Sequence, residues 1–418
     1  MSTKKQLAII SMAFFVSVIQ GAPLWASGGD SLDNLMDAGK VTLDFRYRYE
    51  FVDQEGIDKN ANASTLRTRL GFRSGDWRGW GFNIEVNDVR HVLSNNFNAG
   101  GGTTPDRGGV YPVVADPKGT RLNQGYISYS GIKDWAFRVG RQRINLDNER
   151  FIGSVGWRQT EQVFDSGTVA WSNDKADVAL TYVQWVRRIF GEESPIGKHR
   201  QDGTVMLRGA YDLSFGKLVG YYYRIENRDA PGFSTNTFGA RLAGKPAIND
   251  NWALRYEVEY ANQKDLGNNP ASFSADYVHL VAAAAVGIFD FGVGYELLSG
   301  KEGTIFNEAF RTPLATLHRW NGWADQFLST PAAGLVDTHV TFKVTPGRFL
   351  IDARYHNFDA DSGSDKYGTE LDLRVGYKFT DRFRGDLYLA DFNGRDNPGI
   401  VNDFVDVTKF WVQVYFKL

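Results

Sequence analysis

The stretch VTLDFRYRYEF, residues 41–51, decides the fold. Its odd positions are all apolar or aromatic, and charged side chains fill the even positions from 44 to 50. Because successive side chains of a strand point to opposite faces, this pattern predicts one apolar face and one charged face. The same alternation returns in residues 66–73, 252–260 and 367–379. Tyr and Trp at the ends of such apolar faces are typical of the lipid-facing band of an outer-membrane barrel.

The rest of the chain extends this pattern to an all-β architecture. We count about 18 candidate strands, with 16 as the alternative, and the connections between them alternate between short and long. Outer-membrane barrels place short turns on the periplasmic side and long loops outside, so the order supports a monomeric transmembrane antiparallel β-barrel. The longest connections include residues 91–120, 143–162 and 298–336, and a connection at 52–64 is also expected to be long.

The N-terminus predicts the compartment. Lys4 and Lys5 precede an apolar stretch from Leu7 to Ile19, and small residues follow up to Ala26. This is the layout of a secretory signal peptide, which we place at residues 1–26. We expect residues 27–39 to form a short periplasmic segment and residues 40–418 to form the barrel in the bacterial outer membrane. The segment before the barrel is too short for a large plug, so a passive channel is expected.

Composition narrows the function classes. The 418 residues carry 47 Lys plus Arg against 49 Asp plus Glu, a net charge of -2. The chain therefore lacks the excess of positive charge that is typical of nucleic-acid-binding proteins. The absence of Cys excludes disulfides, zinc–thiolate sites and cysteine nucleophiles. A mean hydropathy of -0.35 without an apolar run near twenty residues argues against a helical membrane protein.

Arginines on the polar faces are the candidate pathway residues. They are concentrated in the first ten strands, whereas the later strands are mixed or acidic. A guanidinium offers paired donors to an oxyanion, so such a wall favours carboxylated or phosphorylated solutes. The alternative is that these arginines pair with acids on neighbouring strands and brace a packed lumen. The predicted pathway residues are Arg46, Arg48, Arg67, Arg69, Arg73, Arg138, Arg208, Arg241, Arg354 and Arg374.

Two sets of motifs stand out in the sequence. The first set is Gly140-Arg141-Gln142-Arg143, Asn148 to Gly153 with Arg150, Trp157-Arg158-Gln159 and Phe164-Asp165, and the second is Pro313, Thr316, His318, Asn321-Gly322-Trp323, Asp325, Phe327, Pro331 and Gly334 to Asp337. Both sets resemble motifs of the alginate-export family of bacterial outer-membrane porins. For the alginate exporter itself the resemblance implies an 18-stranded monomeric barrel with an arginine-lined pore for a uronic-acid polymer. The mixed charge of the C-terminal half argues against strict selectivity for a polyanion.

The connection at 298–336 is too long for a simple link between strands. It either folds inward as a constriction or covers the mouth, or its two Trp residues pack it against the rim. The candidate constriction residues are His318, Trp320, Asn321, Trp323 and Asp325.

The leading functional hypothesis is a passive channel for anionic sugars, oligosaccharides, alginate-like uronates or other small acidic solutes, with an acidic polysaccharide and outer-membrane lipid as further partners. A general or differently selective porin is the alternative within the same class. From other classes, a hydrolase and a structural barrel with a filled lumen stay open, although no His stands beside a nucleophile motif. His339 and His356 are expected to be polar lining, and no enzyme activity, cofactor or metal site is expected. The solute and the direction of transport are not encoded in residues that we can interpret.

Overall fold

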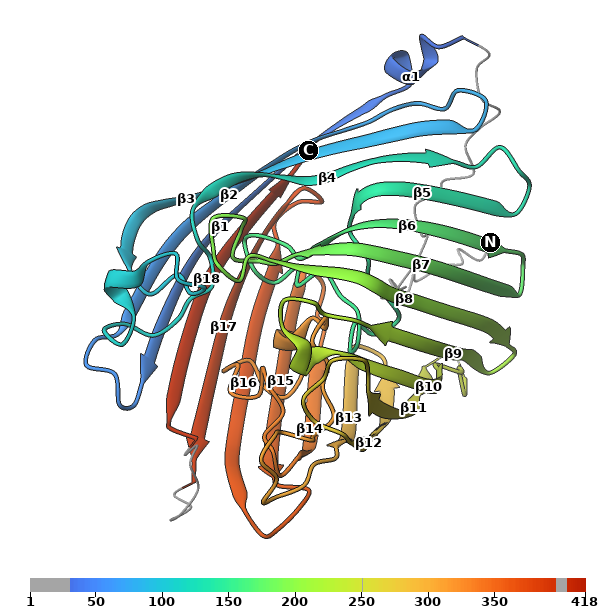
Figure 1. Cartoon of the computed structure of the whole chain (residues 1–418). Helices are drawn as coiled ribbons and strands as arrows, with labels where there is room; N and C mark the ends of the chain where they lie inside the picture. The colour runs from blue at the N-terminus through green and yellow to red at the C-terminus, as the bar shows by residue number, and fades with distance from the viewer. Residues whose placement is uncertain (1–30, 250, 396–403) are drawn as a thin grey trace, which may run out of the picture.

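The chain closes into a single antiparallel β-barrel (Figure 1). The computed structural model describes residues 31–249, 251–395 and 404–418. Each of its 18 strands pairs with its neighbours in sequence, and β18 (Val407–Lys417) pairs back with β1 (Lys40–Gln54), placing Tyr49 opposite Val412. The predicted count of 18 strands is therefore confirmed, and the alternative of 16 is set aside.

In the part of the chain that the structure describes, helical structure is confined to four short segments, α1 (Asn34–Asp37), η1 (Pro105–Arg107), η2 (Pro231–Phe233) and η3 (Leu317–Arg319). Among the described residues, no helix has the length and apolar character needed to cross a membrane. The predicted signal peptide, residues 1–26, lies outside the described residues. The remaining strands are β2 (Ala61–Arg73), β3 (Trp80–Asn96), β4 (Gly119–Tyr129), β5 (Trp135–Gln142), β6 (Val163–Ser172), β7 (Ala176–Arg187), β8 (Lys198–Leu213), β9 (Gly216–Ile225), β10 (Thr235–Gly244), β11 (Trp252–Asp265), β12 (Ser274–Val286), β13 (Phe289–Leu298), β14 (Leu335–Val344), β15 (Phe349–Asp359), β16 (Lys366–Lys378) and β17 (Phe383–Gly394).

The two faces of the wall differ as the alternation predicts. On β13, Phe291 and Val293 are exposed on the outer face, whereas Glu296 is buried on the inner face. The same holds on β11, where Val258 and Tyr260 are exposed and Glu259 is buried. An apolar outer face is what a barrel needs in contact with lipid, where charged side chains are costly.

Long loops gather at one end of the barrel and short turns at the other. The turns at 214–215 and 287–288 are two-residue hairpins, and the longest loop spans 299–334. Two of these loops are shorter than predicted. The connection expected at 52–64 spans only 55–60, because β1 and β2 continue their pairing to Val52 and Ala61. The connection expected at 91–120 spans 97–118, because β3 continues to Asn96 and β4 begins at Gly119. The ends of these strands carry polar side chains, so hydrophobic alternation alone predicts them as part of the loop.

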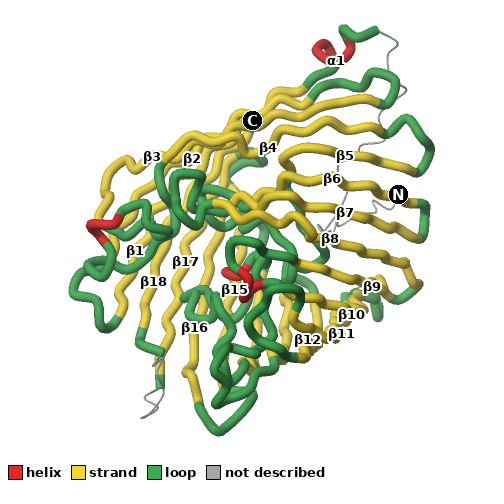
Figure 2. Tube along the Cα trace, viewed as in Figure 1, coloured by secondary structure: helices red, strands yellow, loops and turns green. Residues whose placement is uncertain are grey.

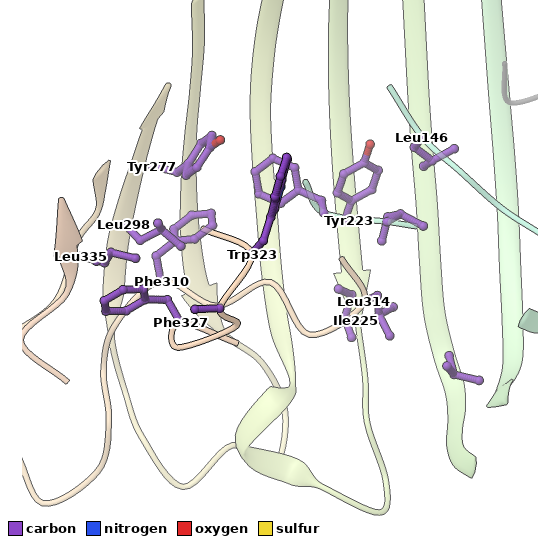
Figure 3. Close-up of a cluster of buried hydrophobic side chains, with 14 of the residues drawn as sticks. Leu146, Tyr223, Ile225, Tyr277, Leu298, Phe310, Leu314, Trp323, Phe327 and Leu335 are labelled. Atoms are coloured by element: carbon purple, nitrogen blue, oxygen red, sulfur yellow. The ribbon is translucent and has the colours of Figure 1, made fainter. Parts of the chain in front are cut away.

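Loop segments lie within the barrel wall (Figure 2), and side chains of loops 143–162 and 299–334 join the buried apolar cluster of its interior. The two loops pair with each other where Gly153 N–H donates to the Leu314 carbonyl at 2.8 Å. Phe151 of the first loop packs against Phe310 of the second and against Tyr221 of β9. Figure 3 shows the apolar cluster that side chains of these loops, among them Phe310 and Leu314, form with inner side chains of the wall. The core of this barrel is therefore built from its own inserted loops.

Candidate functional site

Loop 143–162 spans the lumen from β1 to β11. At one end, Arg158 forms an ion pair of 3.1 Å with Glu50 of β1. At the other, the Asn148 amide donates to Glu257 and Glu259 of β11 at 2.8 and 2.9 Å. The loop therefore divides the interior and narrows any path through it.

Two predicted pathway arginines hold this loop against the wall. Arg46 Nε donates to Gln159 Oε1 at 2.8 Å, and its Nη1 donates to the Gly156 carbonyl at 3.0 Å. Arg48 Nη2 donates to the Trp157 carbonyl at 2.6 Å, and the guanidinium lies 4.1 Å from the centroid of that indole ring. Arg46 is 2% exposed and Arg48 is fully buried, so both charges are committed to protein contacts.

The other predicted arginines of the early strands also have partners. Their carboxylate contacts come from adjacent strands or from loop 143–162, as expected for the bracing alternative. Arg138 stacks over Tyr126 at 4.5 Å, and Arg73 is half-buried at the short-turn end of β2. The ion pairs are Arg67–Asp44, Arg69–Glu161 at 2.8 Å, Arg208–Asp147 at 2.8 Å and Arg241–Glu257 at 2.6 Å.

Loop 299–334 carries the residues predicted for a constriction. His318 Nδ1 lies 2.7 Å from Asp325 Oδ1, and Asp325 Oδ2 accepts from Arg158 and from Lys409 of β18, both at 3.0 Å. Burial alone raises the pKa of the Asp325 carboxyl, yet His318 and the two cations outweigh burial and hold this pKa well below its ordinary value. The His318 ring stacks on Trp157 at 4.0 Å, so the two inserted loops are locked together.

The centre of this arrangement is a buried ion pair between the loops and the wall. Arg150 Nε donates to Glu296 Oε1 at 2.7 Å, and Arg150 Nη2 donates to Asn321 Oδ1 at 3.0 Å. Asn321 in turn donates to Asp337 of β14 at 3.1 Å, while the Arg150 guanidinium lies 5.3 Å from the Trp320 ring.

The backbone of loop 299–334 completes the attachment. Its Trp323 and Ala324 amides donate to Asp372 and Glu370 of β16 at 3.4 and 2.7 Å. These contacts, with those of Arg150 and Asn321, dock both loops on the inner wall of the barrel.

The remaining motif residues brace the wall beside loop 143–162. Arg141 of β5 binds Asp165 of β6 at 2.7 Å, and Arg187 of β7 reaches the same carboxylate at 2.7 Å. Buried Gln142 donates to a β6 carbonyl at 3.2 Å. Gly140 has φ +131, and a Cβ there would collide with the β4 backbone, so this position requires glycine.

A row of half-exposed cations lines the inner face of β11 and β14 to β17, and we call it the lumen cation row. Strand alternation points all of its members inward, and their side chains are between 18% and 43% exposed. Five cations share only three carboxylates, Asp290, Asp352 and Asp386, which leaves an excess of positive charge. The members are Arg255, Lys343, Arg354, Arg374 and Arg384.

Sequence reasoning found only part of this row. Arg354 and Arg374 are among the predicted pathway residues, but Arg255, Lys343 and Arg384 are not. The alternation already places all five on the inner face. In the sequence, acids on the same strands balance these cations. Only the structure shows that the cations stay accessible while Arg46, Arg48, Arg67, Arg69 and Arg208 are buried.

Comparison with known families identifies the chain. A family model described as alginate export matches residues 39–297. The chain belongs to the alginate export family. The predicted resemblance is thereby confirmed. The closed 18-stranded barrel of this family member has the fold of outer-membrane porin structures.

Solved structures share the fold of this family member at low identity. OccAB2 of Acinetobacter baumannii matches with a TM-score of 0.71 and 15% identity, covering 92% of this chain and 99% of that chain. The outer membrane protein opdK of Pseudomonas aeruginosa matches with a TM-score of 0.65 and 14% identity, covering 91% and 99%. OccK2 (OpdF) of Pseudomonas aeruginosa, solved in complex with glucuronate, matches with a TM-score of 0.67 and 13% identity, covering 92% and 98%. None of the curated proteins matches this chain.

Proposed function

We propose that the protein is a passive outer-membrane channel for small anionic solutes, of which sugar acids such as uronates are the main class. The observation that carries this proposal is the lumen cation row, where five accessible cations share three carboxylates. Positive side chains that line a water-filled path attract anions and repel cations. We also propose that the barrel acts as a monomer and that residues 1–26 are removed on export.

The geometry of the row fits carboxylate recognition. Arg374 and Arg384 bind the two different oxygens of Asp386, at 2.7 Å each, so each guanidinium retains donors for a passing solute. Arg354 lies 5.0 Å from the Trp323 ring and Arg384 lies 4.7 Å from the Tyr415 ring, which fixes the guanidinium planes. A guanidinium held in one plane loses less entropy when it binds a carboxylate.

The inserted loops favour small solutes over a bulky polymer. Loop 143–162 is held by ion pairs to β1 and β13, and loop 299–334 by an ion pair to β18. The glucuronate complex of OccK2 (OpdF), a structure with the same fold, makes glucuronate a suitable probe.

Reversal potentials in planar bilayers under a KCl gradient test the proposal. The variant R354Q/R374Q/R384Q removes three cations of the row, and R90Q, on an exposed pair with Asp88, is the matched control. We expect wild type and R90Q to prefer chloride and the triple variant to lose that preference. Swelling of proteoliposomes in glucuronate is expected to fall in parallel, while swelling in glucose stays unchanged.

Each result bears on the hypothesis. A triple variant that keeps the wild-type reversal potential rejects the cation row as the selectivity determinant and favours a general porin. Correctly folded protein without any conductance rejects the channel and favours a structural barrel filled by its loops.

A further inference from the structure

Two histidines and an aspartate meet on the inner wall where β14 pairs with β15. His339 lies directly opposite His356 in the strand register, and Asp337 stands two residues before His339 on the same face. Their neighbours Val340 and Tyr355 are exposed on the outer face, which fixes the three polar side chains on the lumen side.

The distances among these side chains suit one metal ion. Asp337 Oδ1 lies 2.9 Å from His356 Nδ1 and 3.4 Å from His339 Nδ1, and one ligand atom from each residue falls within 4.8 Å of the others. Ligands at about 2.0–2.1 Å around a tetrahedral zinc ion are separated by about 3.3 Å. The three atoms therefore already stand near the corners of one coordination site.

Unpaired polar atoms around the site give independent support. Within the part of the chain that the structure describes, His339 Nδ1, His356 Nε2 and Asp372 Oδ2 are buried and make no hydrogen bond. His356 Nε2 and Asp372 Oδ2 lie 3.8 Å apart, with side chains that are 5% and 0% exposed. An imidazole that binds a metal through one nitrogen usually donates its other N–H to a carboxylate, so Asp372 stands where this partner is needed.

The second carboxylate oxygen of Asp337 already has a hydrogen-bond donor. Asn321 of loop 299–334 donates to Asp337 Oδ2 at 3.1 Å, which orients the carboxylate and leaves Oδ1 toward the two imidazoles. The described chain has a second cluster of this kind, formed by Glu257, Glu259 and His279. It differs because other side chains already occupy its carboxylates. Its carboxylates are occupied by Arg241 at 2.6 Å and by Asn148 of the loop, and it carries no proposal.

We propose that Asp337, His339 and His356 bind one divalent transition-metal ion of the Zn²⁺ class inside the lumen, with Asp372 as the hydrogen-bond partner of His356. Two imidazoles and one carboxylate are a typical ligand set for zinc, whereas Mg²⁺ and Ca²⁺ prefer sites made of oxygens. This site revises the expectation from sequence that His339 and His356 are only polar lining. It lies beside Asn321, so a bound ion adds a charge next to the anchor of loop 299–334.

Isothermal titration calorimetry of the full-length barrel in detergent with ZnCl₂ tests this inference. We expect one zinc site in the wild type that excess MgCl₂ does not displace. H339A and H356Q are expected to weaken the affinity at least tenfold. D372N is expected to weaken it about 10- to 100-fold, as partners of ligating imidazoles commonly do. H199A is the control, because His199 contacts Asn227 at 3.0 Å, away from the site.

The heat-dependent electrophoretic shift of folded barrels verifies that each variant is folded. If H356Q fails this check, H339A and D372N still decide, since neither removes His356. Wild-type protein that takes up no zinc overturns the inference, and so does a folded H339A variant with wild-type affinity. Loss of binding in H199A to the same extent as in H339A also overturns it, because the zinc would then sit elsewhere.

Discussion

Replacing Arg150 by Met is expected to release the inserted loops. The Arg150–Glu296 pair is 2.7 Å long, and both side chains are 1% exposed. Removing one partner of a buried ion pair costs about 3–5 kcal/mol, because the other charge stays buried without compensation. Arg150 also donates to Asn321 of loop 299–334, so this cost falls on the docking of that loop. The undocked population should therefore rise by roughly two to four orders of magnitude.

Amide hydrogen exchange of peptides that cover residues 320–326 measures this change. The Trp323 and Ala324 amides in that segment donate to wall carboxylates and exchange only when the loop undocks. The double variant R150M/E296Q should recover part of the protection, because no unpaired charge is left. R90M is the control, since Arg90 is 59% exposed and such a pair contributes about 0–1 kcal/mol. Exchange of R150M within threefold of that of R90M would refute the reasoning.

Three further outcomes are expected. Gly322→Ala should speed the same exchange, because Gly322 has φ +82 and a Cβ there collides with a carboxylate of β16. Gly303→Ala is the control: Gly303 has φ +72 but lies in open space, so this variant should change the exchange less. The depressed pKa of Asp325 gives docking energy that is present above the ordinary carboxyl pKa of about 3.9 and is lost only below it. Burial also lowers the pKa of His318, so protonation of this imidazole opposes docking below its ordinary pKa of about 6.5. Exchange corrected for its intrinsic pH dependence should thus be faster at pH 5 than at pH 7 in the wild type and equal at both pH values in H318Q. Faster exchange at pH 5 in H318Q would contradict the pairing of Asp325 with Arg158 and Lys409. Val293→Arg on the outer face of β13 should destabilise the barrel by about 2–4 kcal/mol in urea titrations in lipid vesicles, because it places a charge in contact with lipid. Ile132→Arg in a short turn should cost only about 0–1 kcal/mol. Equal costs would mean that the outer face of β13 does not contact lipid.

The fold could be predicted from the sequence because each strand carries its own evidence. Residues 41–51 show the two faces of the wall without any knowledge of neighbours, and repetition of this pattern predicts the number of strands. The strand ends were less certain, as at Val52, because polar side chains continue the pairing there without an apolar alternation. The Phe151 and Trp323 motifs gave the family but not their physical role.

The site depended on contacts that no local pattern contains. Arg48 and Arg354 look alike in the sequence, since both alternate with apolar residues on a strand. Arg48 is buried because loop 143–162 lies on it, whereas Arg354 stays partly exposed beside the inserted loops. Likewise, 17 positions separate His339 from His356, and only the register of β14 and β15 brings them together.

The sequence by itself thus determined that this chain is a barrel, which way each side chain faces and to which family it belongs. Period-two alternation is a local property, and a strand expresses it wherever the strand lies. The tertiary structure alone decided which inward charges are accessible. Burial depends on where loops 143–162 and 299–334 dock, and their docking is fixed by partners such as Glu296 and Asp337, which belong to strands far along the chain.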